Sequence, residues 1–186
     1  EAEDVCPNQI SKFPYLKCIL STGSPLIDEN YDFVYKNWKE DVQLCSISGG
    51  TDIISCFALG NPILPVTRGE LQCIGLGMKV ESFDEKGNSI YNQKGELVCT
   101  QAFPSMPIYF WNDDNNEKYN NAYFDTFKGI WNHGDYISIS ESGSVKIFGR
   151  SDTTLNPGGV RIGTAEIYQT VERFEEIEDS LVIGQP

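Results

Sequence analysis

The sequence has no long apolar run and no leader-like beginning. No stretch approaches the roughly 18 consecutive apolar residues that a membrane-spanning helix needs. No basic segment followed by an apolar one opens the chain, as a secretory signal would. We therefore expect a soluble, cytosolic protein without membrane insertion. The chain also lacks an initiator methionine, so Glu1 is either a processed end or the start of an excised segment.

Basic residues are few. The chain has 14 lysines and arginines against 27 acidic residues, which gives a formal net charge of -13. Such a surface repels polyanions, so nucleic acid and anionic membranes are excluded as general partners. A phosphate-bearing ligand would have to be bound by a local arrangement of groups.

Residues typical of metal centres and disulfide frameworks are sparse as well. The chain has one histidine, His133, and six cysteines without a CxxC pair. Several of the cysteines fall in apolar, strand-like runs, which favours buried free thiols over metal ligands or disulfides. We interpret His133 as a structural residue, because a single histidine cannot build a metal site with such scattered thiols.

The chain has enough apolar material for a buried core, since 40% of its 186 residues are hydrophobic and 12% are aromatic. Its first third predicts a strand over 16–20, a helix and a strand over 42–47. Ser24 is the expected N-cap of that helix and Pro25 its first residue. Each strand ends at a glycine-bearing loop, and open α/β sheets bind ligands at such loops.

The middle of the chain predicts antiparallel strands. Apolar and other residues alternate over 74–81, and glycines mark hairpins near 87–88 and 94–95. A strand over 96–100, a short helix over 117–128 and a hairpin around 141–144 follow. The fold class is therefore mixed α/β with a small barrel-like or sandwich-like antiparallel sheet.

The end of the chain predicts a strand over 160–162, a helix from Ala165 with Thr164 as N-cap, and a strand over 180–183. Roughly 35 residues cannot form an independent core, so we expect the beginning of a second domain.

The stretch 149–163 sets Arg150, Asp152 and Arg161 around a glycine pair. This suits anion binding on a moving segment; an exposed loop with scattered charges is the alternative.

Several motifs occur in a fixed order. They span 21–26, 48–53, 131–135, 149–152, 159–162 and 165–167. Together they resemble the signature of the adenylate-forming acyl-CoA synthetase superfamily. The runs 109–113, 133–135 and 154–157 are similar to its acetoacetate-activating branch. The resemblance implies that 1–151 is the later portion of a large AMP-binding domain, and 152–186 the hinge and truncated start of a small C-terminal domain.

The resemblance also implies an activity. A carboxylate, here acetoacetate or a similar short acid, would attack the α-phosphate of ATP to give an acyl-adenylate. Coenzyme A would then displace AMP, and Mg²⁺ would accompany ATP. Neither the lysine-bearing phosphate loop nor the far C-terminal lysine of the superfamily occurs in these residues. We therefore expect the segment alone to be inactive and to need the rest of its own chain.

The resemblance implies roles only for residues that match the motifs of the superfamily. Gly23, Ser24 and Pro25 correspond to the loop against adenine, for which a helix-capping turn is an equally compatible interpretation. Thr51 matches the hydroxyl that meets phosphate. Asp52 matches the Mg²⁺-binding glutamate of the family but is one methylene shorter.

Asp135 and Arg150 correspond to the ribose-binding pair, although a Gly-Asp turn before a strand is a common structural alternative for Asp135. Asp152 corresponds to the hinge residue. Arg161 corresponds to an arginine near the phosphates, whereas a helix-capping role is favoured for Glu166.

Further glycines are assigned by the same resemblance. Gly158 and Gly159 fall where the pantetheine arm would pass. Gly49 and Gly50 fall where acetyl-CoA synthetases have a bulky tryptophan motif, so the resemblance implies a deeper acyl pocket here. Two alternatives remain: an adenylation domain that loads a carrier protein, and a non-catalytic nucleotide-binding module.

Overall fold

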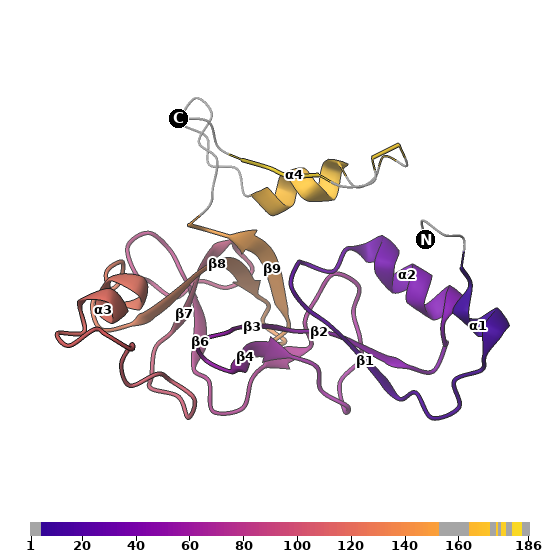
Figure 1. The fold of residues 1–186 in the computed structure, drawn as a ribbon, viewed down its shortest axis with the longest axis horizontal. Helices are drawn as coiled ribbons and strands as arrows, with labels where there is room; N and C mark the ends of the chain where they lie inside the picture. Colours follow the sequence, from indigo (N-terminus) through magenta and orange to yellow (C-terminus); the bar gives the residue numbers. More distant parts are fainter. Residues whose placement is uncertain (1–4, 153–163, 172–173, 175, 178–179, 184–186) are drawn as a thin grey trace.

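A computed structural model describes residues 5–152, 164–171, 174, 176–177 and 180–183 (Figure 1). The helices are α1 (Pro7–Ile10), α2 (Asp28–Asn37), α3 (Glu117–Tyr123) and α4 (Thr164–Val171). The strands are β1 (Cys18–Ser21), β2 (Gln43–Ser46), β3 (Ser48–Gly50), β4 (Ser55–Leu59), β5 (Cys73–Ile74), β6 (Val80–Phe83), β7 (Gly95–Cys99), β8 (Trp131–Ile139) and β9 (Val145–Arg150). No helix in these ranges is long and apolar enough to cross a membrane.

The first unit is the predicted strand, helix and strand. β1 and β2 pair in parallel, with Leu20 opposite Cys45, and α2 connects them. Tyr31 on α2 is fully buried. The predicted helix start is wrong, because α2 begins at Asp28 and its N-cap position, Ile27, makes no side-chain cap bond. The residues from Ser24 to Ile27 remain outside the helix and line cavities instead.

Two antiparallel sheets confirm the predicted fold class. One has the order β3-β4-β5 and the other β6-β7-β8-β9. The alternating residues over 74–81 do not form one continuous strand, because β5 ends at Ile74 and β6 begins at Val80. Between them Gly77 has a φ of +79°, and the Leu76 side chain is 98% exposed. The left-handed glycine turns the chain where the alternating pattern alone predicted extended backbone.

An aromatic cluster fills the space between the antiparallel sheets and α3. Phe57 is fully buried and Trp131 is 1% exposed. Phe103 makes edge-to-face contacts with both rings, at centroid distances of 5.7 and 5.4 Å. The predicted helix over 117–128 is confirmed in a shorter form, since α3 ends at Tyr123. Figure 1 shows α3 at the opposite end of the molecule from α1 and α2.

At the C-terminal end, the predicted helix is confirmed as α4, which lies against β9 (Figure 1). The strand predicted over 180–183 is wrong: none of these residues is in a strand, and within the described part of the chain none pairs with a neighbouring strand. The strand predicted over 160–162 lies outside the described residues.

Candidate functional site

A cavity of about 330 Å³ lies where β1, β2, β3, β8 and β9 come together. Its lining includes six residues that the sequence motifs had singled out. They are Gly23, Ser24, Pro25, Gly49, Asp135 and Arg150. Tyr168 of α4 also lines the cavity. Residues more than a hundred positions apart in the sequence therefore meet in one cavity.

Strand topology explains this convergence. Because β1 and β2 are parallel, the loop that carries Gly23 and the segment that carries Gly49 leave the same edge of the sheet. β8 and β9 are antiparallel neighbours, and their register sets Asp135 opposite Arg150. The hairpin thus brings a carboxylate and a guanidinium to the mouth of the same cavity.

Asp135 is a buried carboxylate whose negative charge is only partly compensated by Arg150. It belongs to the buried face of β8, where every second residue points inward. Burial raises the pKa of Asp135 to about 6, and the opposing effect of Arg150 does not cancel this increase. The Arg150 Nη1 to Asp135 Oδ1 distance is 3.5 Å. A carboxylate held this way can be ionised by a ligand that supplies hydrogen-bond donors.

Arg150 is engaged mainly with Asp152. Its Nε donates to Oδ1 of Asp152 at 2.9 Å, and its Nη2 contacts Oδ2. The hydrogen bond from Arg150 lowers the pKa of Asp152. The two side chains are 44% and 53% exposed, and an ion pair so exposed contributes little stability. Gly134, with a φ of +76°, makes room for the pair, because a Cβ there would lie 2.9 Å from Nη2.

His133 is a site neighbour that the sequence interpretation missed. Its Nε2 lies 3.3 Å from the Gly49 carbonyl oxygen and 3.9 Å from Oδ2 of Asp135. Burial lowers its pKa, so the imidazole is neutral at neutral pH. The available signal was spacing: His133 precedes Asp135 by two residues, and in a strand such residues share a face.

The glycine pair of β3 is packed from two sides. A Cβ on Gly49 would lie 2.0 Å from the Ser55 carbonyl oxygen, in the backbone of the paired strand. A Cβ on Gly50 would lie 2.6 Å from Cε1 of His133. Gly49 lines the cavity with its backbone, but its side-chain direction points into the β3–β4 pair. The structure thus gives no room there for a bulky side chain.

Thr51 and Asp52 lie on the exposed turn after β3 and do not line the cavity. Oδ2 of Asp52 accepts a hydrogen bond from the Tyr123 hydroxyl at 2.5 Å. Burial and the adjacent Asp52 raise the pKa of Tyr123, so its hydroxyl keeps its proton and donates. Within the described residues, Oδ1 of Asp52 accepts no hydrogen bond, and no cluster of three metal-ligating side chains occurs. One free carboxylate oxygen fits Mg²⁺ that takes its other ligands from phosphate and water.

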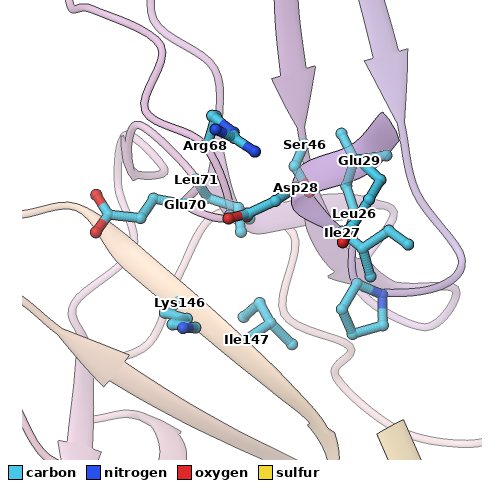
Figure 2. Close-up of a pocket in the computed structure, with 12 residues that line it drawn as sticks. Leu26, Ile27, Asp28, Glu29, Ser46, Arg68, Glu70, Leu71, Lys146 and Ile147 are labelled. Carbon is cyan, nitrogen blue, oxygen red and sulfur yellow. The ribbon is translucent and has the colours of Figure 1, made fainter. Parts of the chain in front are cut away.

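A second cavity of about 250 Å³ adjoins the first and shares Pro25, Ser46 and Ile147 with it. Figure 2 shows charged side chains of both signs around it, contributed by α2, β9 and the loop before β5. Arg68 on its wall pairs with Asp32 at 2.9 Å. The sequence motifs assign nothing to this cavity. Gly158, Gly159 and Arg161, which they do assign, lie outside the described residues.

Known proteins resemble the chain in sequence. No protein-family model matches it. It is 58% identical to the acetoacetyl-coenzyme A synthetase of Rhizobium meliloti (strain 1021) over 170 residues, 91% of this chain and 26% of that protein. It is 51% identical to the acetoacetyl-CoA synthetase of Mus musculus over 186 residues, all of this chain and 28% of that protein. The chain thus spans about a quarter of the length of these relatives.

Solved structures resemble it in fold. The acetoacetyl-CoA synthetase of Streptomyces lividans superposes with a TM-score of 0.82 at 48% identity, covering 90% of this chain and 26% of that one. An anthranilate CoA ligase, solved in complex with anthranoyl-AMP, superposes with a TM-score of 0.73 at 20% identity, covering 92% and 31%; this second likeness concerns the fold alone. By sequence and by fold, the chain is similar to one segment of acetoacetyl-CoA synthetases.

Proposed function

We propose that the chain supplies part of the nucleotide and acyl sites of an ATP-dependent acetoacetate–CoA ligase. The observation that carries the proposal is the convergence of six motif residues on one cavity. High identity to acetoacetyl-CoA synthetases supports acetoacetate as the acid. The full-length protein would form an acyl-adenylate from ATP and the acid, and then transfer the acyl group to coenzyme A.

Each residue of the cavity has a proposed role in holding the nucleotide. The backbone of Gly23, Ser24 and Pro25 would lie against adenine. The Asp135 carboxylate would accept hydrogen bonds from both ribose hydroxyls, since its two oxygens offer several acceptor positions. Arg150 would reach the ribose after exchanging part of its exposed pair with Asp152 for ligand contacts.

The turn after β3 would bind the phosphate end. We assign Thr51 to a phosphate oxygen and Asp52 to Mg²⁺, which, when bound, would neutralise charge on the phosphates. Arg161 would add a fixed positive charge, and Gly158 and Gly159 would leave room for the pantetheine arm. Gly49 and Gly50 would border the acyl group through their backbone, and Asp152 would be the hinge at the start of the small domain, 152–186.

Pyrophosphate exchange by the full-length protein tests this function. We expect acetoacetate to support exchange between ATP and labelled pyrophosphate, and acetate and butyrate to support it at least about tenfold less well, because a site that donates a hydrogen bond to the keto oxygen is left with an unpaired donor by acids that lack this oxygen. Equal exchange with butyrate would remove the assignment of acetoacetate. No exchange with any of the three acids would remove the adenylation chemistry as well.

A further inference from the structure

The hydroxyl of Tyr123 links α3 to the turn after β3. Tyr123 donates to Oδ2 of Asp52, a residue 71 positions earlier in the sequence. No motif places either residue near the other. The contact therefore ties a side chain without an assigned role to the carboxylate proposed to bind Mg²⁺.

Packing restricts the Tyr123 ring independently of its hydrogen bond. The ring stacks on Trp131 with a centroid distance of 3.6 Å and an interplanar angle of 13°. Phe110 and Tyr119 contact it edge-on, at 6.0 and 6.1 Å. Trp131 is itself 1% exposed. Because packing already restricts the ring, holding the hydroxyl at Asp52 requires little further loss of side-chain freedom.

Asp52, in contrast, has little else to orient it. Its side chain is exposed, on a turn where Ile54 has a φ of +49°. Among the described residues, the Tyr123 hydroxyl makes the one hydrogen bond to its carboxylate. The hydroxyl occupies Oδ2 and leaves Oδ1 for a ligand. A neutral donor keeps the negative charge of the carboxylate available, which an arginine or lysine at the same place would neutralise.

We propose that Tyr123 is a positioning residue that orients the Asp52 carboxylate for Mg²⁺ accompanying ATP. The inference rests on the proposed function for the identity of the ion, and Tyr123 itself does not touch the ion. The short side chain of Asp52 explains why a positioning residue is needed. Its carboxylate lies closer to the backbone than the glutamate carboxylate of the family, so it needs a fixed orientation to present one oxygen outward.

The test compares Tyr123→Phe with Tyr119→Phe in the full-length protein. Both changes remove one hydroxyl from the same aromatic cluster, but the Tyr119 hydroxyl donates to the Pro107 carbonyl and not to Asp52. ATP affinity is measured by calorimetry with and without Mg²⁺. We expect Tyr123→Phe to reduce the Mg²⁺-dependent gain in ATP affinity about tenfold, consistent with a hydrogen bond to a charged group. ATP affinity without Mg²⁺ should not change, and Tyr119→Phe should behave like the unaltered protein.

A double-mutant cycle separates positioning from general stability. In an Asp52→Asn background, Tyr123→Phe should have no further effect on the Mg²⁺ dependence, because the two residues act through one interaction. An unchanged Mg²⁺ dependence in Tyr123→Phe, or an equal loss of ATP affinity with and without Mg²⁺, would overturn the proposal. So would the absence of any Mg²⁺-dependent ATP binding by the unaltered protein. The unaltered protein could also bind ATP in a Mg²⁺-dependent way but show no acetoacetate-dependent pyrophosphate exchange. In that case the proposed function fails, and the calorimetry of Tyr123→Phe still tests the role of Tyr123.

Discussion

At the scale of single residues, Asp135 is a buried carboxylate with few partners to stabilise its charge. It is buried, and its arginine neighbour is bound mainly to Asp152. We expect Asp135→Asn in the full-length protein to weaken ATP and AMP binding by about tenfold or more, because a charge-assisted acceptor is lost. Calorimetry measures this, with Asp125→Asn, an exposed carboxylate on the loop after α3, as the control. Equal affinities in the two variants would contradict the ribose assignment.

The raised pKa of Asp135 gives a pH prediction. The charged groups around it are Arg150, Asp152 and Glu96, and neutral His133 lies beside it. Adenosine, which has no titrating phosphate, should bind roughly tenfold more weakly at pH 5 than at pH 7.5, since the carboxylate is protonated below about pH 6. A binding titration across this range measures the effect. Asp135→Asn should remove the pH dependence of adenosine binding. If this dependence persists in the variant, a group other than Asp135 causes it.

The raised pKa of Asp135 also predicts that Asp135→Asn increases the stability of the fold. The folded-state pKa of Asp135 lies above its ordinary value of 3.8. The folded protein therefore binds the proton more tightly, so stability falls as pH rises from about 4 to 6 and remains lower above that. Asp135→Asn removes this cost and should stabilise the protein at pH 7 by about 1 to 3 kcal/mol. Thermal unfolding at pH 7 and at pH 4 measures the gain, which should vanish at the lower pH.

At the scale of elements, the β3–β4 pair depends on its glycines. Gly49→Ala sets a Cβ against the Ser55 carbonyl, and Gly50→Ala sets one against the His133 ring. Backbone cannot move aside as readily as a side chain, so we expect Gly49→Ala to cost about 1 to 3 kcal/mol and Gly50→Ala less. Thermal or chemical unfolding of the two variants compares them. A larger loss for Gly50→Ala would mean that His133 is held more rigidly than β4.

The proposed hinge at Asp152 gives a second prediction at this scale. A hinge at Asp152 must rotate its backbone, and proline restricts that rotation. Asp152→Pro should therefore impair one half-reaction, adenylate or thioester formation, at least tenfold more than the other in single-turnover measurements. Asp152→Ala is the matched control, because it also removes the pair with Arg150 but leaves the backbone free. Equal losses in both half-reactions would argue against a hinge.

Most elements could be predicted from the sequence, because periodicity reports which face of a segment is buried. The alternating residues on both sides of 141–144 predicted the hairpin that β8 and β9 form. The start of α2 could not be predicted, since Ser24 and Pro25 have the chemistry of a helix start but line a cavity instead. The turn at Gly77 was missed because its left-handed backbone interrupts a pattern that stays alternating in sequence.

The motifs indicated part of the cavity lining but not its contacts, and Gly50, Thr51 and Asp52, which they also indicated, do not line the cavity. Motif order indicated Asp135 and Arg150, and the structure adds the competition between Asp135 and Asp152 for the guanidinium. The contact between Tyr123 and Asp52 depends on packing between distant segments, which no local pattern encodes. The place of His133 beside Asp135 could have been predicted, because residues two apart in a strand share a face. The direction of a Cβ at Gly49 likewise depends on the pairing with β4.

At the scale of the whole molecule, the central claim is that the full-length protein activates a carboxylate as an adenylate. The most direct measurement follows oxygen from acetoacetate labelled with ¹⁸O in its carboxylate, supplied with ATP, Mg²⁺ and coenzyme A. We expect one labelled oxygen in the phosphate of AMP, because the carboxylate oxygen that attacks the α-phosphate stays with phosphorus when the thiol displaces AMP. Formation of acetoacetyl-CoA with unlabelled AMP, or with ADP and labelled phosphate, would contradict the account.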